Sequence, residues 1–142
     1  METLRHPLAR AALQEVVDLH AFFQAWLVGS VPGTDEAFAQ LEVVLEQTFS
    51  MVTPDGRRLG RREVIENLRR AHGAKGPPGA FHIAIREPEV LLLAEPLVAL
   101  GYIEEQDTAG ALTRRRSTAL LAVYPKAATW LAVHETWVEP AR

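Results

Sequence analysis

Apolar positions follow two different periods along the chain. Up to about residue 72 they recur every three or four residues, which is typical of amphipathic helices. This spacing predicts three helices, over residues 7–28, 34–44 and 61–72. Gly29 and Gly73 are expected to end the first and third helices, and Thr34 is expected to cap the second.

The second half of the chain reads as strands. Long runs rich in branched and aromatic residues predict four strands, over residues 81–93, 97–106, 114–124 and 129–138. A shorter strand is expected at 48–53, closed by the turn-forming residues 54–56. Helices first and long antiparallel strands afterwards predict an α+β fold: three N-terminal helices packed on a strongly bent antiparallel sheet that forms a cone.

The last two strands are expected to form a hairpin in which Tyr124 pairs with Thr129. Side chains alternate along a strand, so this register places Arg116 on the same face as Glu135. Trp130 and His134 then lie on the opposite face. A register shifted by one residue would exchange every one of these assignments. Neither face is plainly polar, which indicates that helices cover one face and a partner or another layer covers the other.

Composition narrows the class of protein. The chain has 142 residues, 48% of them hydrophobic and 23% charged, with a net charge of -3. These values predict one domain over residues 1–142 that does not bind nucleic acid, which usually requires a basic surface. The absence of cysteine excludes disulfides and thiolate chemistry. Charged residues interrupt the first helix, so we expect neither a signal peptide nor a membrane span, and hence a cytoplasmic location.

The candidate site lies where the last three strands meet the helices. We expect its wall to include the following residues: Trp26, Phe49, Tyr102, Glu104, Gln106, Arg116, Thr118, Glu135 and Trp137. A carboxylate inside an apolar cone has a raised pKa and can transfer protons, which makes Glu104, Glu135 and Tyr102 the catalytic candidates. Alternatively, Glu104 and Arg116 form a structural ion pair, with Arg116 stacked on Trp137.

The positions of three histidines do not predict a metal site. His20 falls within the apolar stripe of the first helix and is expected to be packed and hydrogen-bonded. His72 and His82 flank the loop at 74–79 and can reach the mouth of the cone. No histidine and carboxylate pair has the spacing of metal ligands, so we predict no metal site.

Four local patterns carry a resemblance to a known family. They are Phe49-x-Met51-x-x-Pro54-Asp55-Gly56 followed by Leu59-Gly60, His82-x-x-Ile85-x-x-Pro88-x-Val90, Gly101-Tyr102-Ile103, and Trp130-x-x-Val133-His134. With the order of elements, they resemble the nuclear transport factor 2-like superfamily, and within it the SnoaL-like proteins and the association domain of calcium/calmodulin-dependent protein kinase. The resemblance implies a conical barrel that has a pocket between sheet and helices and dimerises through its sheet.

The sequence also departs from these relatives. Arginines line the pocket of the kinase association domain, whereas Glu104 and Trp137 stand at the corresponding positions here, and Thr136 replaces the second histidine of its closing pattern. SnoaL-like cyclases carry a late catalytic aspartate, but no aspartate follows Asp107, so a base of that kind is either missing here or replaced by Glu135. The fold alone does not choose a reaction.

Two functions remain open. The first is a protein that binds a small apolar molecule in a conical pocket and acts on it without a cofactor, as an isomerase, dehydratase or hydrolase. The second is a non-catalytic association module that forms a homodimer through the sheet. A cavity lined by carboxylates of raised pKa favours the enzyme, whereas a cone filled by Trp26, Phe49 and Trp137 favours the module. The sequence leaves the ligand's identity open.

Overall fold

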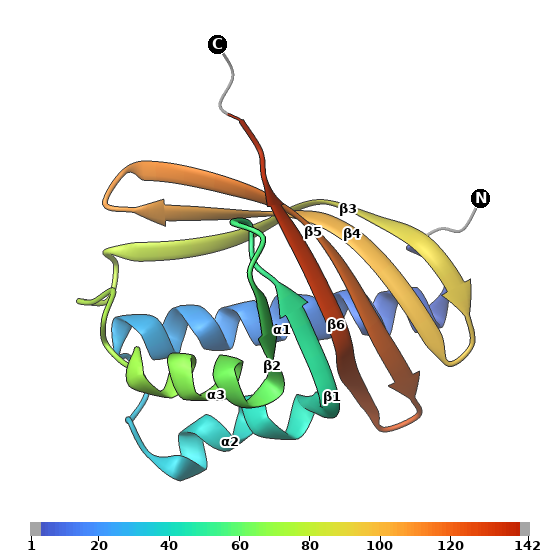
Figure 1. The fold of residues 1–142 in the computed structure, drawn as a ribbon, viewed down its shortest axis with the longest axis horizontal. Coiled ribbons are helices and arrows are strands. Elements are labelled where there is room, and N and C mark those ends of the chain that lie inside the picture. Colours follow the sequence, from blue (N-terminus) through green and yellow to red (C-terminus); the bar gives the residue numbers. More distant parts are fainter. Residues whose placement is uncertain (1–3, 140–142) are drawn as a thin grey trace.

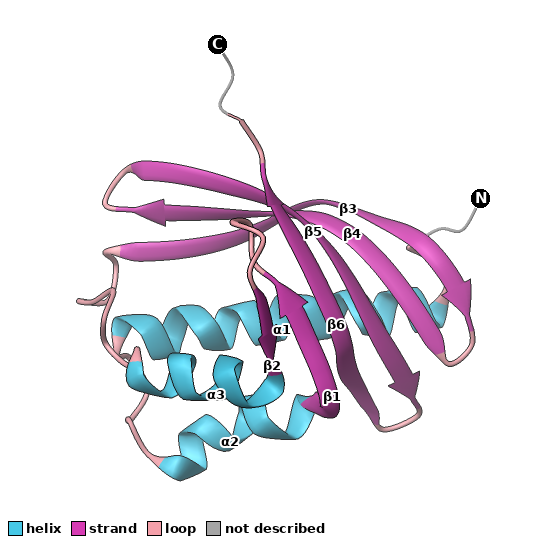
Figure 2. Cartoon of the chain, viewed as in Figure 1, coloured by secondary structure: helices cyan, strands magenta, loops and turns pink. Residues whose placement is uncertain are grey.

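The computed structural model describes residues 4–139, which form three helices and six strands (Figure 2). The helices are α1 (Pro7–Val28), α2 (Asp35–Val44) and α3 (Arg61–Arg70). The strands are β1 (Leu45–Val52), β2 (Arg58–Gly60), β3 (Phe81–Ala94), β4 (Leu97–Thr108), β5 (Ala111–Tyr124) and β6 (Ala127–Trp137). The helices and the four long strands lie where the sequence pattern places them, while β2 was not expected.

The strands form one sheet in the order β2-β1-β6-β5-β4-β3. The pairs β3–β4, β4–β5 and β5–β6 are antiparallel, as expected. The pairing of β1 with β6 is parallel, with Met51 opposite Val133, so the sheet is mixed rather than wholly antiparallel. The sequence gives no local signal for this pair, because its two strands are separated by most of the chain.

All three helices lie on one face of the sheet, which bends over them (Figure 1). Helix α1 runs beneath β3, β4 and β5, while α2 and α3 lie side by side under the other end. Fully buried residues from both layers, such as Phe38, Leu41, Val98 and Leu121, belong to one shared core. The expected α+β cone is therefore present.

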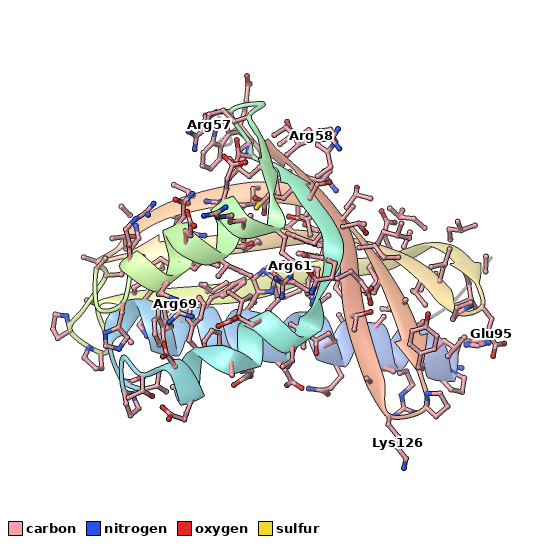
Figure 3. The ribbon with its side chains drawn as sticks, turned by 60° about the horizontal axis from the view of Figure 1, so that its bottom comes forward. Arg57, Arg58, Arg61, Arg69, Glu95 and Lys126 are labelled. Carbon is pink, nitrogen blue, oxygen red and sulfur yellow. The ribbon has the colours of Figure 1, made fainter. Side chains whose placement is uncertain are left out.

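The helix ends explain how the helices take their positions. The Thr34 hydroxyl accepts a hydrogen bond from the Ala37 amide and so caps α2. Gly29 ends α1 at a φ of 75°, a conformation that glycine adopts without steric strain. Arg61, at the start of α3, donates hydrogen bonds to the carbonyls of Glu42 and Leu45 and ties α3 to the end of α2 (Figure 3).

The β5–β6 hairpin differs from the expected register. Tyr124 pairs with Ala127 across the two-residue turn Pro125–Lys126, instead of with Thr129 across four residues. A bulge beside Leu120 and Leu121 then moves the register back by one residue, because Leu121 pairs with Trp130 whereas Leu120 pairs with Ala132. Beyond the bulge, Arg115 lies opposite Trp137, and Ser117 lies opposite Glu135. The net shift from the expected register is one residue there, and a shift of one exchanges the side chains that share a face.

None of the helices among residues 4–139 combines the length and the apolar character that crossing a membrane requires.

Candidate functional site

A cavity of about 410 Å³ lies between the concave face of the sheet and the helices. Its volume falls in the range of pockets that hold small organic ligands. Much of its wall is hydrocarbon, supplied by Leu19, Phe23, Leu27, Leu41, Leu45, Phe49, Met51, Leu59, Val64, Leu68, Ile83 and Val133. The cavity therefore favours a ligand with an apolar body.

A small set of polar side chains converges in this apolar wall. Tyr102, Glu104 and Gln106 reach it together because they alternate along β4 and so share its inner face. His20 comes from α1, and Glu135 from β6. Such a combination, an apolar cavity with a few grouped polar residues, is typical of ligand-binding and active sites.

His20 and Glu104 form a buried ion pair. The Nε2 atom of His20 lies 3.1 Å from Oε1 of Glu104, while its Nδ1 lies 2.7 Å from the Val16 carbonyl. A carbonyl only accepts, so Nδ1 carries a proton, and Nε2 donates to Glu104 when the imidazole is protonated. Gln106 donates to the second carboxylate oxygen, Oε2, at 2.7 Å. Both oxygens of Glu104 are therefore engaged.

The two partners shift each other's pKa in opposite directions. Burial by itself raises the pKa of Glu104, but the hydrogen bond and the charge of His20 outweigh burial and lower this pKa to about 2. Burial by itself lowers the pKa of His20, but the hydrogen bond and the charge of Glu104 outweigh the effect of burial and raise this pKa. The sequence predicted a raised pKa for Glu104, but this group stays ionised. The reason is His20, which is distant in the sequence and adjacent in the fold.

Glu135 has the properties that the sequence predicted for a proton-transfer group. Burial, followed by the charge of Glu104, raises its pKa to about 7, although Arg115 and Ser117 oppose the shift. The Ser117 hydroxyl donates to Oε2 of Glu135 at 3.3 Å, and Nη1 of Arg115 lies 3.7 Å from Oε1. Near neutral pH, this carboxyl group is divided between its protonated and ionised forms and can both take and give a proton.

Tyr102 remains a neutral phenol. Burial, with the charges of Glu104 and Glu135, raises its pKa above the ordinary value. It can therefore donate a hydrogen bond to a ligand over the whole physiological pH range.

The outer end of the cavity is formed by Arg115, Trp137 and Asp55. The guanidinium of Arg115 lies over the Trp137 ring, 4.9 Å from its centroid. The Trp137 indole N–H donates to Oδ1 of Asp55 at 3.0 Å, which links β6 to the turn between β1 and β2. Asp55, expected only to form the turn, also orients this indole.

Six residues of the predicted ligand-binding set lie in the cavity wall: Phe49, Tyr102, Glu104, Gln106, Glu135 and Trp137. Arg116 and Thr118 do not, because the observed hairpin register turns them to the opposite, solvent-exposed face. Arg115 takes the place expected for Arg116, both over Trp137 and beside a carboxylate. Trp26 is buried behind the cavity, where it packs on Phe38 and donates to the Leu68 carbonyl.

Most of the wall was not in the predicted set, including three polar or aromatic residues that matter for the site: His20, Arg115 and Trp130. His20 is packed and hydrogen-bonded as expected, but its partner is a carboxylate in the cavity. The bulge turns Trp130 inward, whereas His134 faces outward as predicted. Proline is favoured at the second position of a tight turn, so Pro125 was the one signal for the shorter hairpin. His72, expected near the mouth of the cone, is not part of the cavity wall; its Nε2 donates a hydrogen bond to the Val31 carbonyl.

No group of three or more histidine, aspartate or glutamate side chains within residues 4–139 is arranged to hold a metal ion.

Comparison with solved structures places this arrangement in a known fold. A nuclear transport factor 2-like protein of unknown function from Pseudomonas aeruginosa is 26% identical, with a TM-score of 0.82 over 91% of this chain and 99% of that one. A putative calcium/calmodulin-dependent kinase II association domain from Exiguobacterium sibiricum is 18% identical, with a TM-score of 0.63 over 99% of both chains. A putative ketosteroid isomerase from Shewanella frigidimarina is 14% identical, with a TM-score of 0.66 over 92% and 98% of the two chains.

These similarities confirm the nuclear transport factor 2-like superfamily, and the last two show the fold alone. No curated protein matches the sequence. A family model described as sucrose-6-phosphate phosphohydrolase C-terminal matches residues 12–139, which include all six strands, helices α2 and α3, most of α1 and the whole cavity wall. The chain therefore belongs to this family, whose members are named for the C-terminal part of a sucrose-6-phosphate phosphohydrolase.

Proposed function

We propose that the chain binds a small, largely apolar molecule in the cavity and acts on it by cofactor-free acid–base chemistry, as an isomerase, dehydratase or hydrolase. The observation that carries this proposal is the position of Glu135, a carboxyl group with a pKa of about 7 in the wall of a cavity of about 410 Å³. A carboxylate that titrates near neutral pH is matched to proton transfer under physiological conditions.

The neighbours of Glu135 support specific roles. Glu104 is ionised and held by His20 and Gln106, so it is not free to exchange protons near neutral pH, but its charge keeps the pKa of Glu135 high. Tyr102 offers a neutral hydroxyl that can donate to a carbonyl oxygen as negative charge develops there. In this scheme Glu135 moves the proton and Tyr102 stabilises the oxygen.

A sugar phosphate, which the family's description suggests, fits the cavity less well. Its many hydroxyl groups would face hydrocarbon, and Glu104, one of the polar groups, already has both oxygens engaged. Buried hydroxyls without partners would oppose binding. We therefore do not extend the substrate of that enzyme to this chain.

Binding is tested with an uncharged fluorophore such as prodan, whose emission shifts to the blue in an apolar site. Met51→Trp adds a large side chain to the cavity wall and should abolish the shift. Val43→Trp adds the same side chain on the exposed surface of α2, where Val43 is 72% exposed, and should leave the shift intact. Equal blue shifts in both variants would contradict binding in the cavity.

Catalysis is tested by hydrogen exchange at carbon. The wild type is incubated with a panel of apolar cyclic ketones in deuterated water, and deuterium next to the carbonyl is followed by NMR. We expect exchange that rises as Glu135 ionises, through a pH of about 7, and that falls roughly 10²- to 10⁴-fold in Glu135→Gln. If the ketones bind but show no exchange that depends on Glu135, proton abstraction from carbon by Glu135 is refuted, and with it the isomerase and the dehydratase.

A second function, homodimeric association through the sheet, has its own support. The outer face of the sheet has a hollow that is lined by both signs of charge, from Arg86, Glu87, Glu105, Arg114 and Arg116, around Ile103. A two-fold axis brings a patch onto a copy of itself, and a patch of mixed charge can pair with its copy. Sedimentation equilibrium should give about twice the chain mass of 15.7 kDa, and Arg116→Glu should shift the protein toward monomer. A wild-type monomer at micromolar concentration would contradict this proposal.

A further inference from the structure

The guanidinium of Arg115 has an unsatisfied donor. Its Nε is out of contact with solvent and has no hydrogen-bond partner among residues 4–139. The whole side chain is 17% exposed, yet the group is a permanent cation. Buried donors nearly always have partners, and an unpaired one destabilises the structure, more so when it is charged. A ligand whose acceptor atom bonds to this guanidinium would remove the destabilisation that the unpaired donor causes.

The positive charge of Arg115 is also only partly neutralised. Its carboxylate neighbour is Glu135, 3.7 Å from Nη1, a separation longer than that of a good hydrogen bond. Glu104, the other buried carboxylate, is paired with His20. Whenever Glu135 carries its proton, no anion balances Arg115 directly. The surroundings of Arg115 therefore favour a ligand that brings one negative charge.

The setting of Arg115 suits a ligand that enters from the open end. Trp137 covers the guanidinium and is itself 46% exposed, and one hydrogen bond, to Asp55, holds its indole. Exposed aromatic side chains change rotamer readily. A ligand that displaces the Trp137 ring from the guanidinium would meet Arg115 in the same wall as the hydrocarbon side chains of the cavity.

We propose that the physiological ligand is an apolar monocarboxylate, whose carboxylate binds the guanidinium of Arg115 and whose hydrocarbon body fills the cavity. The planar fork of an arginine matches the two oxygens of a carboxylate. Ligands with two negative charges are disfavoured because Glu104 and Asp55 also line the cavity. This inference rests on the proposed function, since it names the class of molecule that the cavity binds.

Three probes of equal chain length separate the head group from the apolar body: octanoate, 1-octanol and octylamine. Their affinities are measured by isothermal titration calorimetry at pH 6, where octanoate is ionised and Glu135 is mainly protonated. We expect octanoate to bind at least tenfold more tightly than 1-octanol, and octylamine to bind most weakly. A hydrogen bond to a charged group corresponds to roughly a tenfold to a hundredfold change in affinity.

Arg115→Gln should remove that advantage, so that octanoate loses tenfold to a hundredfold in affinity while 1-octanol is unchanged. Arg62→Gln is the control: it removes the same charge from α3, where the Arg62 side chain is 90% exposed and lies outside the cavity wall, and it should leave octanoate binding intact. If Arg115→Gln does not fold, the ranking of the three probes on the wild type decides the question.

The pH dependence provides a second readout. The charged or titratable groups that line the cavity with Glu135 are His20, Asp55, Arg57, Tyr102, Glu104 and Arg115. Octanoate should bind more weakly as pH rises through about 7, because Glu135 becomes a competing anion. Glu135→Gln should remove this pH dependence of octanoate affinity. If His20 caused the dependence instead, it would persist in Glu135→Gln.

The outcomes separate the two proposals. If 1-octanol binds as tightly as octanoate, or if Arg115→Gln keeps the preference for octanoate, the monocarboxylate inference is overturned while the apolar cavity stands. If none of the three probes binds the folded wild type, the proposed binding of an apolar molecule fails, and the inference fails with it.

Discussion

The imidazole of His20 and the carboxylate of Glu104 meet at 3.1 Å in the interior, although 84 residues separate them in the sequence. Side chains of both are 7% exposed. Removing one partner of such a pair leaves an uncompensated buried charge, which typically costs about 3 to 5 kcal/mol. We therefore expect Glu104→Gln to lower the free energy of unfolding by about that amount, as measured by urea denaturation at pH 6.

The double variant His20→Gln, Glu104→Gln provides the control. Two neutral amides bury no charge, so the double variant should be more stable than the sum of the two single variants implies. Strict additivity of the two single effects would show that the pair contributes no coupling, and it would contradict the assignment of an ion pair.

The pH dependence of stability should identify Glu135. Its pKa is 4.5 unfolded and about 7 folded, so the folded state holds the proton more tightly. The associated stability is fully present below about pH 4.5 and is lost as pH rises to about 7, a change of about 3 kcal/mol. Glu135→Gln should flatten the stability profile over this range, while Glu36→Gln, on the exposed surface of α2, should leave it unchanged.

The ion pair acts in other pH windows. The lowered pKa of Glu104 contributes stability that is present above pH 4.5 and is lost as pH falls toward about 2. The raised pKa of His20 contributes stability that is present below pH 6.5 and is lost as pH rises through its folded value. Burial also raises the pKa of Glu15, so a smaller fall should remain in Glu135→Gln. A Glu135→Gln profile that falls between pH 4.5 and 6.5 as steeply as the wild-type profile would contradict the assignment of that slope to Glu135.

Local chemistry explains which parts of the fold the sequence predicted. The first helix runs from Pro7 to Val28, as expected, because its apolar period and Gly29 are signals carried by the segment itself. The inner face of β4 was also predicted, since Tyr102, Glu104 and Gln106 alternate whatever pairs with them. In both cases the information lies within a few neighbouring residues.

The errors concern relationships between distant segments. The hairpin register depends on a two-residue turn and on a bulge that turns Trp130 inward, so Arg115 instead of Arg116 faces the cavity. The lowered pKa of Glu104 depends on His20, which only the packing of α1 on the sheet brings near. Neither the bulge nor this contact has a signature in the local pattern.

Gly76 lies in the loop that packs against the end of α1, and replacing it tests how tight that packing is. A Cβ at this position would lie 2.9 Å from the Val28 carbonyl oxygen and 3.3 Å from that of Gly73, and backbone atoms move less easily than side chains. Gly76→Ala should therefore lower the free energy of unfolding by about 1 to 3 kcal/mol. Gly60→Ala, whose Cβ meets only the Glu63 side chain at 3.9 Å, should cost less than Gly76→Ala in the same thermal or urea denaturation.

Trp26 joins α1 to α3 within the core. Its indole N–H donates to the Leu68 carbonyl at 2.6 Å, and its ring packs on Phe38 with centroids 4.8 Å apart. Trp26→Phe keeps an aromatic ring but removes the donor and part of the packed volume, so we expect a loss of about 1 to 3 kcal/mol in stability. Hydrogen exchange should accelerate along α3, where the carbonyl loses its partner. Because Trp26 lies outside the cavity wall, affinity for the octanoate probe should be unchanged in the folded variant, and a large loss of affinity would show that this tryptophan belongs to the binding site after all.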